Sequence, residues 1–218
     1  MLVAGDAAHM SFPAGGVGLN VGVQDAMNLG WKLAAEVRGR ASAGLLDTYH
    51  AERHPVGEAL SGYTLAQTAL ITTSTPEGLA LRALLSEAIA TQPAFALSLS
   101  DKLSALDVRY PSGDAHPLVG TRVADRDGTL FGWPHSGRAI MLNLSGAALE
   151  TATGYTASLG IRTHASTLSE EDPAWSGVRA AIIRPDGHVW WATDTGDDTD
   201  VLEALSALGT GFGERQEP

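Results

Sequence analysis

The stretch Pro13-Ala14-Gly15-Gly16-Val17-Gly18-Leu19-Asn20 decides the fold, because it joins the motif Gly5-Asp6-Ala7-Ala8-His9 to a long helical pattern. The apolar run Leu2-Val3-Ala4 before it predicts a short buried strand. Glycines let a backbone turn tightly and approach a ligand closely. A helix start offers unpaired N–H groups and about half a positive charge. The stretch therefore predicts a site for an anion or an electron-rich carbonyl, and the alternative is a connection that only permits tight packing.

The glycine spacing excludes the common nucleotide motifs. Gly16, Gly18 and Gly22 give G-x-G-x-x-x-G, one residue too long for the dinucleotide fingerprint. The sequence has no G-K-S/T, so it has no Walker loop.

Downstream of this stretch the periodicity predicts a helix over 19–38, ended by Gly39. Its apolar positions recur near the helical period and include Leu19, Val23, Ala26, Met27, Leu33, Ala34 and Val37. A polar stripe steps by four and so lies on one face: Asn20, Gln24, Asn28, Lys32 and Glu36. Further helices are predicted over 45–73, with Pro55 inside, and over 77–90 and 94–106.

After residue 108 the pattern becomes α/β. Strands are predicted over 139–144 and 161–165, with a helix over 147–158 between them. The turn Pro185-Asp186-Gly187 predicts a hairpin of 178–183 and 188–192. Asp200, with Glu203 three residues on, should cap a last helix that ends near Leu208. The predicted organisation is a mainly helical region 1–108, a linker 109–115, an α/β domain 116–210 and a tail 211–218.

Composition narrows the function classes. Of the 218 residues 44% are hydrophobic and 18% charged, enough to build a core and too apolar for a disordered chain. With 14 Lys+Arg against 25 Asp+Glu the net charge is −11, so nucleic acid and anionic membranes are not expected partners. The absence of cysteine excludes disulfides and thiol chemistry. No membrane span or basic leader is apparent, and we expect a cytoplasmic protein.

Three motifs together resemble the FAD-dependent aromatic hydroxylases. These are single-component monooxygenases similar to p-hydroxybenzoate and phenol hydroxylase, and the resemblance is closest to those acting on aromatic polyketides in antibiotic pathways. The motifs are Gly5–His9, Pro13–Asn20 and Gln24-Asp25-Ala26-Met27-Asn28-Leu29-Gly30-Trp31-Lys32-Leu33-Ala34, followed by a matching segment, Leu46–Pro55. Residues 116–209 are similar to the family's thioredoxin-like C-terminal domain. The implied α/β fold is a helical remnant of an FAD-binding domain followed by a small thioredoxin-like domain.

The resemblance implies roles for individual residues. Asp6 would accept hydrogen bonds from the ribityl hydroxyls of FAD, and the backbone near Pro13 would approach the flavin ring. Gly18, Leu19 and Asn20 would present N–H groups to the pyrimidine edge of the ring. The implied cofactor-binding set is Gly5, Asp6, Pro13, Gly16, Gly18, Leu19 and Asn20. The family inserts oxygen into an aromatic ring with NADH or NADPH as reductant of the flavin, and we name no catalytic side chain and no metal ligand.

The sequence also departs from the family. It has no G-x-G-x-x-G for the ADP part of FAD and lacks the family's other Asp-Gly motif, and Ala14 and Val17 replace the common Thr and Gln. It resembles about the second half of a hydroxylase, expected to bind FAD weakly or not at all alone and to act only when an N-terminal half is supplied covalently or in trans. The alternative is a non-catalytic remnant that mediates oligomerisation or association, for instance as a homo-oligomer.

Weaker signals leave alternatives open. His9 either forms an acid/base pair with Asp6 or orients the loop, which we favour. His50 and His54 either share a metal or lie on a solvated helix face, and Glu52 and Arg53 could form structural ion pairs. For the acidic run at 194–200, helix capping is favoured over calcium binding. We expect a core or interface role for the tryptophans of the C-terminal region, Trp133, Trp175, Trp190 and Trp191. At the position where a thioredoxin-like domain would carry its redox pair, the sequence is Ser145-Gly146-Ala147-Ala148 and contains no sulfur.

Overall fold

The computed structural model describes residues 1–113, 115–123, 137–145, 156, 161–165, 173–195 and 197–208. The chain divides into two compact units. The first consists of Met1–Ala26 and His50–Val108, and the second of Met27–Tyr49 and Arg109–Pro218. Helix α1 (Val17–Val37) begins in the first unit and continues into the second after Ala26. The domain limits given above stay a prediction.

Four long helices confirm the predicted helical segments within a few residues. They are α1, α2 (Thr48–Thr72), α3 (Pro76–Thr91) and α4 (Pro93–Ser104). Local chemistry sets several of their ends. Gly39, at φ 65°, follows the last turn of α1 and donates its N–H to Glu36, and the Thr75 hydroxyl caps α3 by accepting from the N–H of Gly78. Pro76 and Pro93 occupy first-turn positions, where no backbone donor is needed.

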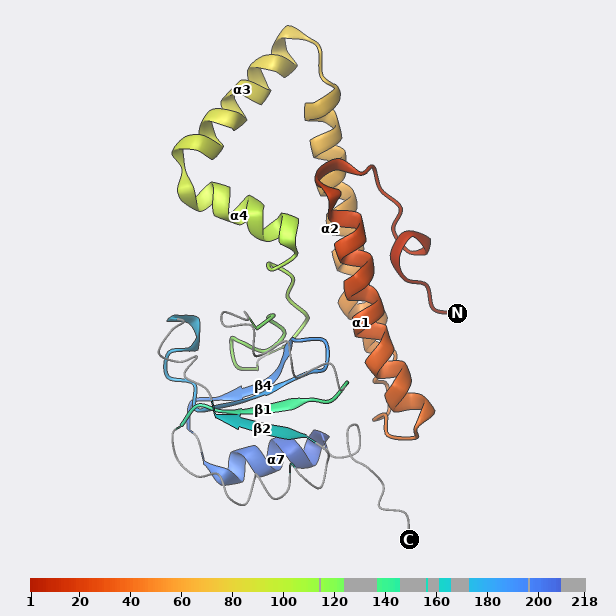
Figure 1. The fold of residues 1–218 in the computed structure, drawn as a ribbon, viewed down its shortest axis with the longest axis vertical. Coiled ribbons are helices and arrows are strands. Elements are labelled where there is room, and N and C mark those ends of the chain that lie inside the picture. Colours follow the sequence, from red (N-terminus) through yellow and green to blue (C-terminus); the bar gives the residue numbers. More distant parts are fainter. Residues whose placement is uncertain are drawn as a thin grey trace. The chain divides into compact units, whose positions relative to one another are not determined.

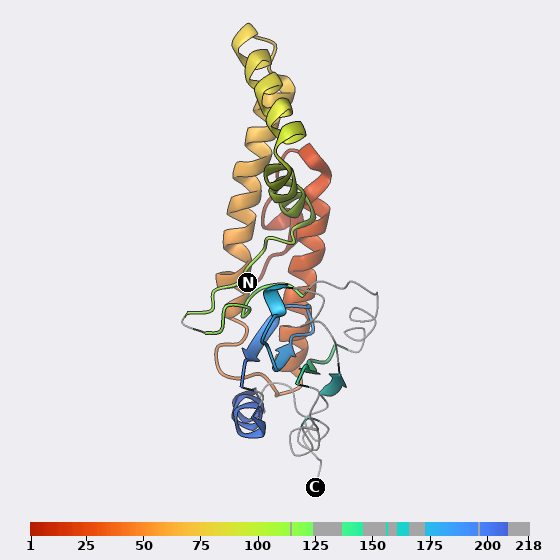
Figure 2. The same cartoon turned by 90° about the vertical axis from the view of Figure 1, so that its left-hand side faces the viewer.

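The first half of α1 lies beside α2 in both views (Figure 1, Figure 2). Val17 and Val21 of α1 pack against Val56 and Leu60 of α2. Two short 3-10 turns, Gly5–Ala7 and Ala14–Gly16, precede α1.

One expectation for the N-terminal region is wrong. Leu2-Val3-Ala4 is not a strand: no described strand pairs with it, and its first two residues are exposed. A strand forms only where a neighbour takes its backbone N–H and C=O groups, so an apolar run alone does not make one.

The buried face of α1 does not follow its apolar positions. Leu19 and Val23 are 79% and 51% exposed, whereas Asn28 and Lys32 of the polar stripe are fully buried. The helix buries polar side chains because the tertiary structure supplies partners for them, and periodicity cannot detect such partners.

The second unit contains a four-stranded mixed sheet in the order β2-β1-β3-β4. The strands are β1 (Ile140–Asn143), β2 (Arg162–Ala165), β3 (Ala180–Ile183) and β4 (Val189–Thr193). β1 pairs in parallel with β2 and antiparallel with β3, and β3 and β4 form the predicted hairpin. This order fits the thioredoxin-like domain that the resemblance implies, and the α/β class is confirmed. The helix predicted over 147–158 lies outside the described residues except for Thr156, which is helical.

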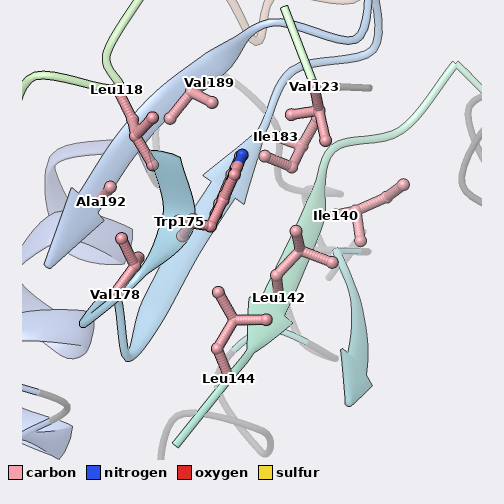
Figure 3. Packing of buried hydrophobic residues seen from close by; sticks show 11 residues of the cluster. Leu118, Val123, Ile140, Leu142, Leu144, Trp175, Val178, Ile183, Val189 and Ala192 are labelled. Atoms are coloured by element: carbon pink, nitrogen blue, oxygen red, sulfur yellow. The ribbon is translucent and has the colours of Figure 1, made fainter. Parts of the chain in front are cut away.

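The sheet is buried on both faces at its strands β1 and β3. On one face Ile140, Leu142 and Ile183 pack around Trp175 (Figure 3). On the other face Met141 and Ile182 pack against Val201 and Leu205 of α7 (Asp198–Leu208), which runs along the sheet in Figure 1. Adjacent strand residues point to opposite faces, which is why consecutive apolar residues of β1 serve both layers.

The start of α7 differs from the prediction. The helix begins at Asp198, and the Asp197 carboxylate accepts the N–H of Thr199 at 2.9 Å, so Asp197 takes the capping role expected of Asp200. Asp200 lies inside the first turn and accepts a hydrogen bond from the Thr195 hydroxyl.

Candidate functional site

The Gly5–His9 motif forms a tight turn rather than the end of a strand. Gly5 has φ 59°, and its carbonyl accepts the N–H groups of Ala8 at 2.8 Å and His9 at 3.0 Å. The backbone of Gly5 lies against Gly22 of α1, where an added Cβ would be 3.2 Å from the Gly5 Cα. Asp6 is exposed on this turn, so its carboxylate faces outward while the backbone around it is held against the helix.

A buried carboxylate holds that turn in place. Asp25 of α1 is 1% exposed, and its Oδ2 accepts the Gly5 N–H at 3.0 Å and lies 2.5 Å from His9 Nε2. Its Oδ1 accepts from Arg53 Nε of α2 at 2.7 Å. Arg53 also donates to the carbonyl of Val21 at 3.2 Å. We call Gly5, His9, Asp25 and Arg53 the Asp25 cluster, and it ties the turn, α1 and α2 together.

The Asp25 cluster decides between the alternatives left open for His9. The imidazole is bound to Asp25, not to Asp6, and its ring packs on α2 at Gly57, where an added Cβ would be 3.2 Å from His9 Cδ2. The loop-orienting role is therefore the one this geometry supports. The Arg53 guanidinium forms a structural ion pair, as expected, and the carboxylate that it binds is Asp25. No local signal joins Asp25 to Arg53, because they are 28 residues apart on two helices.

The start of α1 is left open by the chain's own side chains. Gly15 and Gly16 have φ of 71° and 68°, and they turn the backbone into the helix. Gly15 is closely packed, since a Cβ there would lie 2.8 Å from the Leu103 side chain. By contrast, a Cβ at Gly16 or Gly18 would meet nothing within 4 Å.

The predicted cofactor-binding residues fall on two adjoining segments. Gly5 and Gly18 are half-buried, and the exposed members are Asp6, Pro13, Gly16, Leu19 and Asn20. Ala14 and Val17, the two departures from the family pattern, are buried beneath them. The accessible surface around the first turn of α1 therefore combines the open backbone at Gly16 and Gly18 with exposed side chains, and a helix start of this kind can present N–H groups to a ligand.

A second buried carboxylate lies in the other unit, in the turn between β3 and β4. Asp186 is 7% exposed and accepts hydrogen bonds from Asn28 Nδ2 and Trp31 Nε1 of α1, both at 3.2 Å. It also binds Arg184 through two nitrogens, at 3.0 and 2.5 Å, and lies 3.6 Å from His188 Nδ1. Burial would raise the pKa of the Asp186 carboxyl, but Arg184 and His188 outweigh burial and hold that pKa well below its ordinary value.

Aromatic rings surround the cation of this pair. The Arg184 guanidinium carbon lies 4.9 Å from the Tyr110 ring and 5.1 Å from the Trp31 ring, and Tyr110 stacks on His188 at 4.1 Å. We call Asn28, Trp31, Tyr110, Arg184, Asp186 and His188 the Asp186 cluster. The sequence predicted the turn at 185–187 but not the role of its carboxylate.

The weaker candidates form no second site. His50 and His54 are exposed with ring centroids 4.8 Å apart, and the part of the chain that the structure describes contains no group of three metal-ligating side chains. Asp194 pairs with His116 at 3.2 Å. Trp175 is a core residue and Trp190 and Trp191 pack at the core's edge, while Trp133 and residues 146–148 lie outside the described residues. Within the described helices, none is long and apolar enough to cross a membrane.

The described residues combine an accessible helix start beside a carboxylate-bearing turn, in the first unit, with a small mixed sheet in the second unit. Two family models match the chain: an FAD binding domain over residues 1–63 and the aromatic-ring hydroxylase C-terminal domain over residues 112–214. The chain belongs to the FAD-dependent aromatic-ring hydroxylases. FAD is the cofactor of this family.

Curated relatives and solved structures agree with this assignment. The chain is 42% identical over 216 residues to rifampicin monooxygenase of Streptomyces venezuelae, a match that covers 98% of this chain and 42% of that protein. It is 40% identical over 228 residues to anhydrotetracycline monooxygenase of Streptomyces rimosus, which covers 98% of this chain and 43% of that protein. It matches the structure of OxyS anhydrotetracycline hydroxylase from Streptomyces rimosus with a TM-score of 0.77 at 37% identity, covering 98% of this chain and 44% of that one. For the structure of CabE, an aromatic hydroxylase from angucycline biosynthesis, the TM-score is 0.78 at 39% identity. This match covers 98% of this chain and 45% of CabE. The chain thus spans less than half the length of these relatives.

Proposed function

We propose that the chain supplies the flavin-ring loop and the first turn of α1 to an FAD-dependent monooxygenase that hydroxylates an aromatic, polyketide-type substrate. NADH or NADPH reduces the flavin in this proposal. The observation that carries it is the open backbone at Gly16 and Gly18, next to an outward-facing Asp6 on a turn that the Asp25 cluster holds. The relatives named for rifampicin and tetracycline chemistry support the substrate class.

Each residue has a binding or orienting task in this proposal. Asp6 accepts hydrogen bonds from ribityl hydroxyls, and Gly18, Leu19 and Asn20 direct backbone N–H groups at the pyrimidine edge of the ring. The positive end of α1 favours negative charge there by about 0.3–2 kcal/mol. Bound flavin supplies the redox and oxygen chemistry, and the protein binds and orients it.

The ADP part of FAD needs residues of another kind. The 218 residues contain no G-x-G-x-x-G, so a segment that carries this motif, in trans or covalently joined, must hold the pyrophosphate. We expect titration of the chain alone with FAD, followed by flavin fluorescence, to give no binding at micromolar concentrations. Micromolar binding would show that the chain holds the flavin without that segment.

A fused protein tests the proposed function directly. The N-terminal part of the related anhydrotetracycline hydroxylase, joined to this chain, should retain FAD and oxidise NADH or NADPH. Gly18→Val should then weaken FAD binding at least about tenfold, because the new side chain occupies an open surface that the flavin needs. Gly30→Val is the matched control: it lies in the same helix, is exposed, and also meets nothing within 4 Å. Equal FAD affinity in the two variants, or a fused protein without flavin, would contradict the proposal.

A second candidate function rests on α3 and α4. Neither helix has a buried residue, and both expose large apolar side chains: Leu79, Leu81, Leu84, Ile89, Leu97 and Leu103. Exposed apolar side chains are typical of association surfaces where they gather into a patch. A colourless homo-oligomer in sedimentation experiments, without any response to flavin, would favour a non-catalytic association module.

A further inference from the structure

The Asp186 carboxylate receives donors from two separate elements at once. Oδ2 accepts from Asn28 Nδ2, Trp31 Nε1 and an Arg184 terminal nitrogen, and Oδ1 accepts from Arg184 Nε. Asn28 and Trp31 are three residues apart, so they lie on one side of α1. One carboxylate of the β3–β4 turn therefore binds two neighbouring positions on the helix.

Arg184 fixes the orientation of that carboxylate. Its bidentate pair with Asp186 is planar and directional, and the guanidinium lies among the rings of Trp31, Tyr110 and Trp190 at 4.9–6.0 Å. Trp31 also packs with Ala35 and Leu45, and it meets Trp190 edge to face with ring centroids 6.4 Å apart. The acceptor and one of its two helix donors are therefore both immobilised by packing.

A buried ion pair is by itself a weak source of folding stability, since well-packed apolar residues at the same positions often stabilise a protein equally. Hydrogen bonds add direction, which apolar contacts lack. If α1 slipped by one residue it would turn by about 100° and shift by about 1.5 Å, and both donors would leave Asp186. This arrangement therefore specifies one rotation and one height of the helix.

We propose that Asp186 is a positioning residue that fixes α1 through Asn28 and Trp31, and with it the first turn of the helix at Val17–Asn20. α1 is one helix from Val17 to Val37, so a constraint at Asn28 acts about 15 Å along the axis from Gly18. The inference rests on the proposed function for its flavin consequence. In this proposal the sheet, which contains no cysteine, contributes to the hydroxylase by positioning α1 and not by thiol chemistry.

Hydrogen exchange of the chain without flavin tests the positioning role. Asp186→Asn should speed the exchange of amides 28–37 about tenfold and that of amides 17–26 several-fold, while amides 140–143 stay protected. Asp194→Asn is the matched control, because its side chain lies just after β4 and is 64% exposed. Faster exchange confined to the β3–β4 turn would overturn the proposal, because a purely local role predicts that result.

A second variant distinguishes a change in the position of α1 from general unfolding of the protein. Trp31→Phe removes the Nε1 donor and part of the ring, keeps an aromatic side chain at this position, and keeps the Arg184–Asp186 pair. It should reproduce the effect on amides 17–26 at smaller size. Unchanged exchange of these amides in Trp31→Phe, alongside unfolding of Asp186→Asn, would contradict the proposal.

The flavin consequence is measured separately in the fused protein. Asp186→Asn should shift the visible absorption spectrum of the bound flavin and weaken FAD binding about threefold. If the unaltered fused protein binds no flavin but the exchange result holds, the proposed function fails and the positioning of α1 stands. If it binds flavin and Asp186→Asn exchanges like the unaltered chain, the positioning role fails and the proposed function stands.

Discussion

Asp186→Ala should lower the free energy of unfolding of the second unit by about 3–5 kcal/mol, the usual cost of removing one partner of a buried ion pair. Arg184 is 4% exposed and would lose the carboxylate that binds two of its nitrogens. Asn28 and Trp31 would lose a buried acceptor as well. Urea unfolding followed by tryptophan fluorescence measures this loss, because the tryptophans that the structure describes belong to the second unit: Trp31, Trp175, Trp190 and Trp191.

Two further variants separate charge from packing. Asp194→Ala removes a carboxylate from an exposed pair with His116 and should cost less than about 1 kcal/mol. Arg184→Met combined with Asp186→Ala removes both buried charges and should be less destabilising than the sum of the single changes. A loss below 1 kcal/mol in Asp186→Ala would mean that Arg184 finds another counter-ion.

The same carboxylate gives a pH dependence whose sign follows from its depressed pKa. A group with a lower pKa in the folded state stabilises the protein above its unfolded value of about 3.9, and the gain disappears as pH falls through the folded value. The stability difference between the unaltered chain and Asp186→Asn should therefore be constant above about pH 5 and shrink at lower pH. Urea midpoints of both proteins between pH 3 and 7 check this, and a difference that grows on acidification would contradict it.

Asp25→Ala should have an effect of similar size on the first unit, again about 3–5 kcal/mol. The Arg53 guanidinium is 3% exposed and would lose its carboxylate, and the Gly5–His9 turn would lose its two bonds to α1. Circular dichroism at 222 nm during urea unfolding follows this unit, since it is mainly helical. Exchange of the amides of residues 5–9 should become much faster.

Asp6→Ala is the matched control for Asp25→Ala. Both carboxylates belong to the same region, but Asp6 is exposed, so its removal should change the free energy of unfolding by no more than about 0.5 kcal/mol. In the fused protein Asp6→Ala should still weaken flavin binding, because the proposed function assigns Asp6 to the ribityl chain. Equal destabilisation by the two substitutions would show that the Asp25 cluster does not hold the turn.

The proposed flavin-contact residues are a set that only the resemblance supplies, and they stay a prediction. The motif from Pro13 to Asn20 indicated a helix start that meets a ligand, and the structure leaves its backbone open at Gly16 and Gly18. What holds the neighbouring turn was not predictable. Asp25 stood inside a recognised motif, yet its partners His9 and Arg53 are 16 and 28 residues away.

The sequence by itself determined the helices, the hairpin and the absence of thiol chemistry, because prolines, glycines, caps and alternation act over a few neighbouring residues. Only the tertiary structure decided which face of α1 is buried and which carboxylates are paired. Asn28 and Trp31 find Asp186 from 158 and 155 residues away. A polar side chain is buried only where such a distant partner satisfies its hydrogen bonds, and the neighbouring sequence does not indicate which residue that partner is.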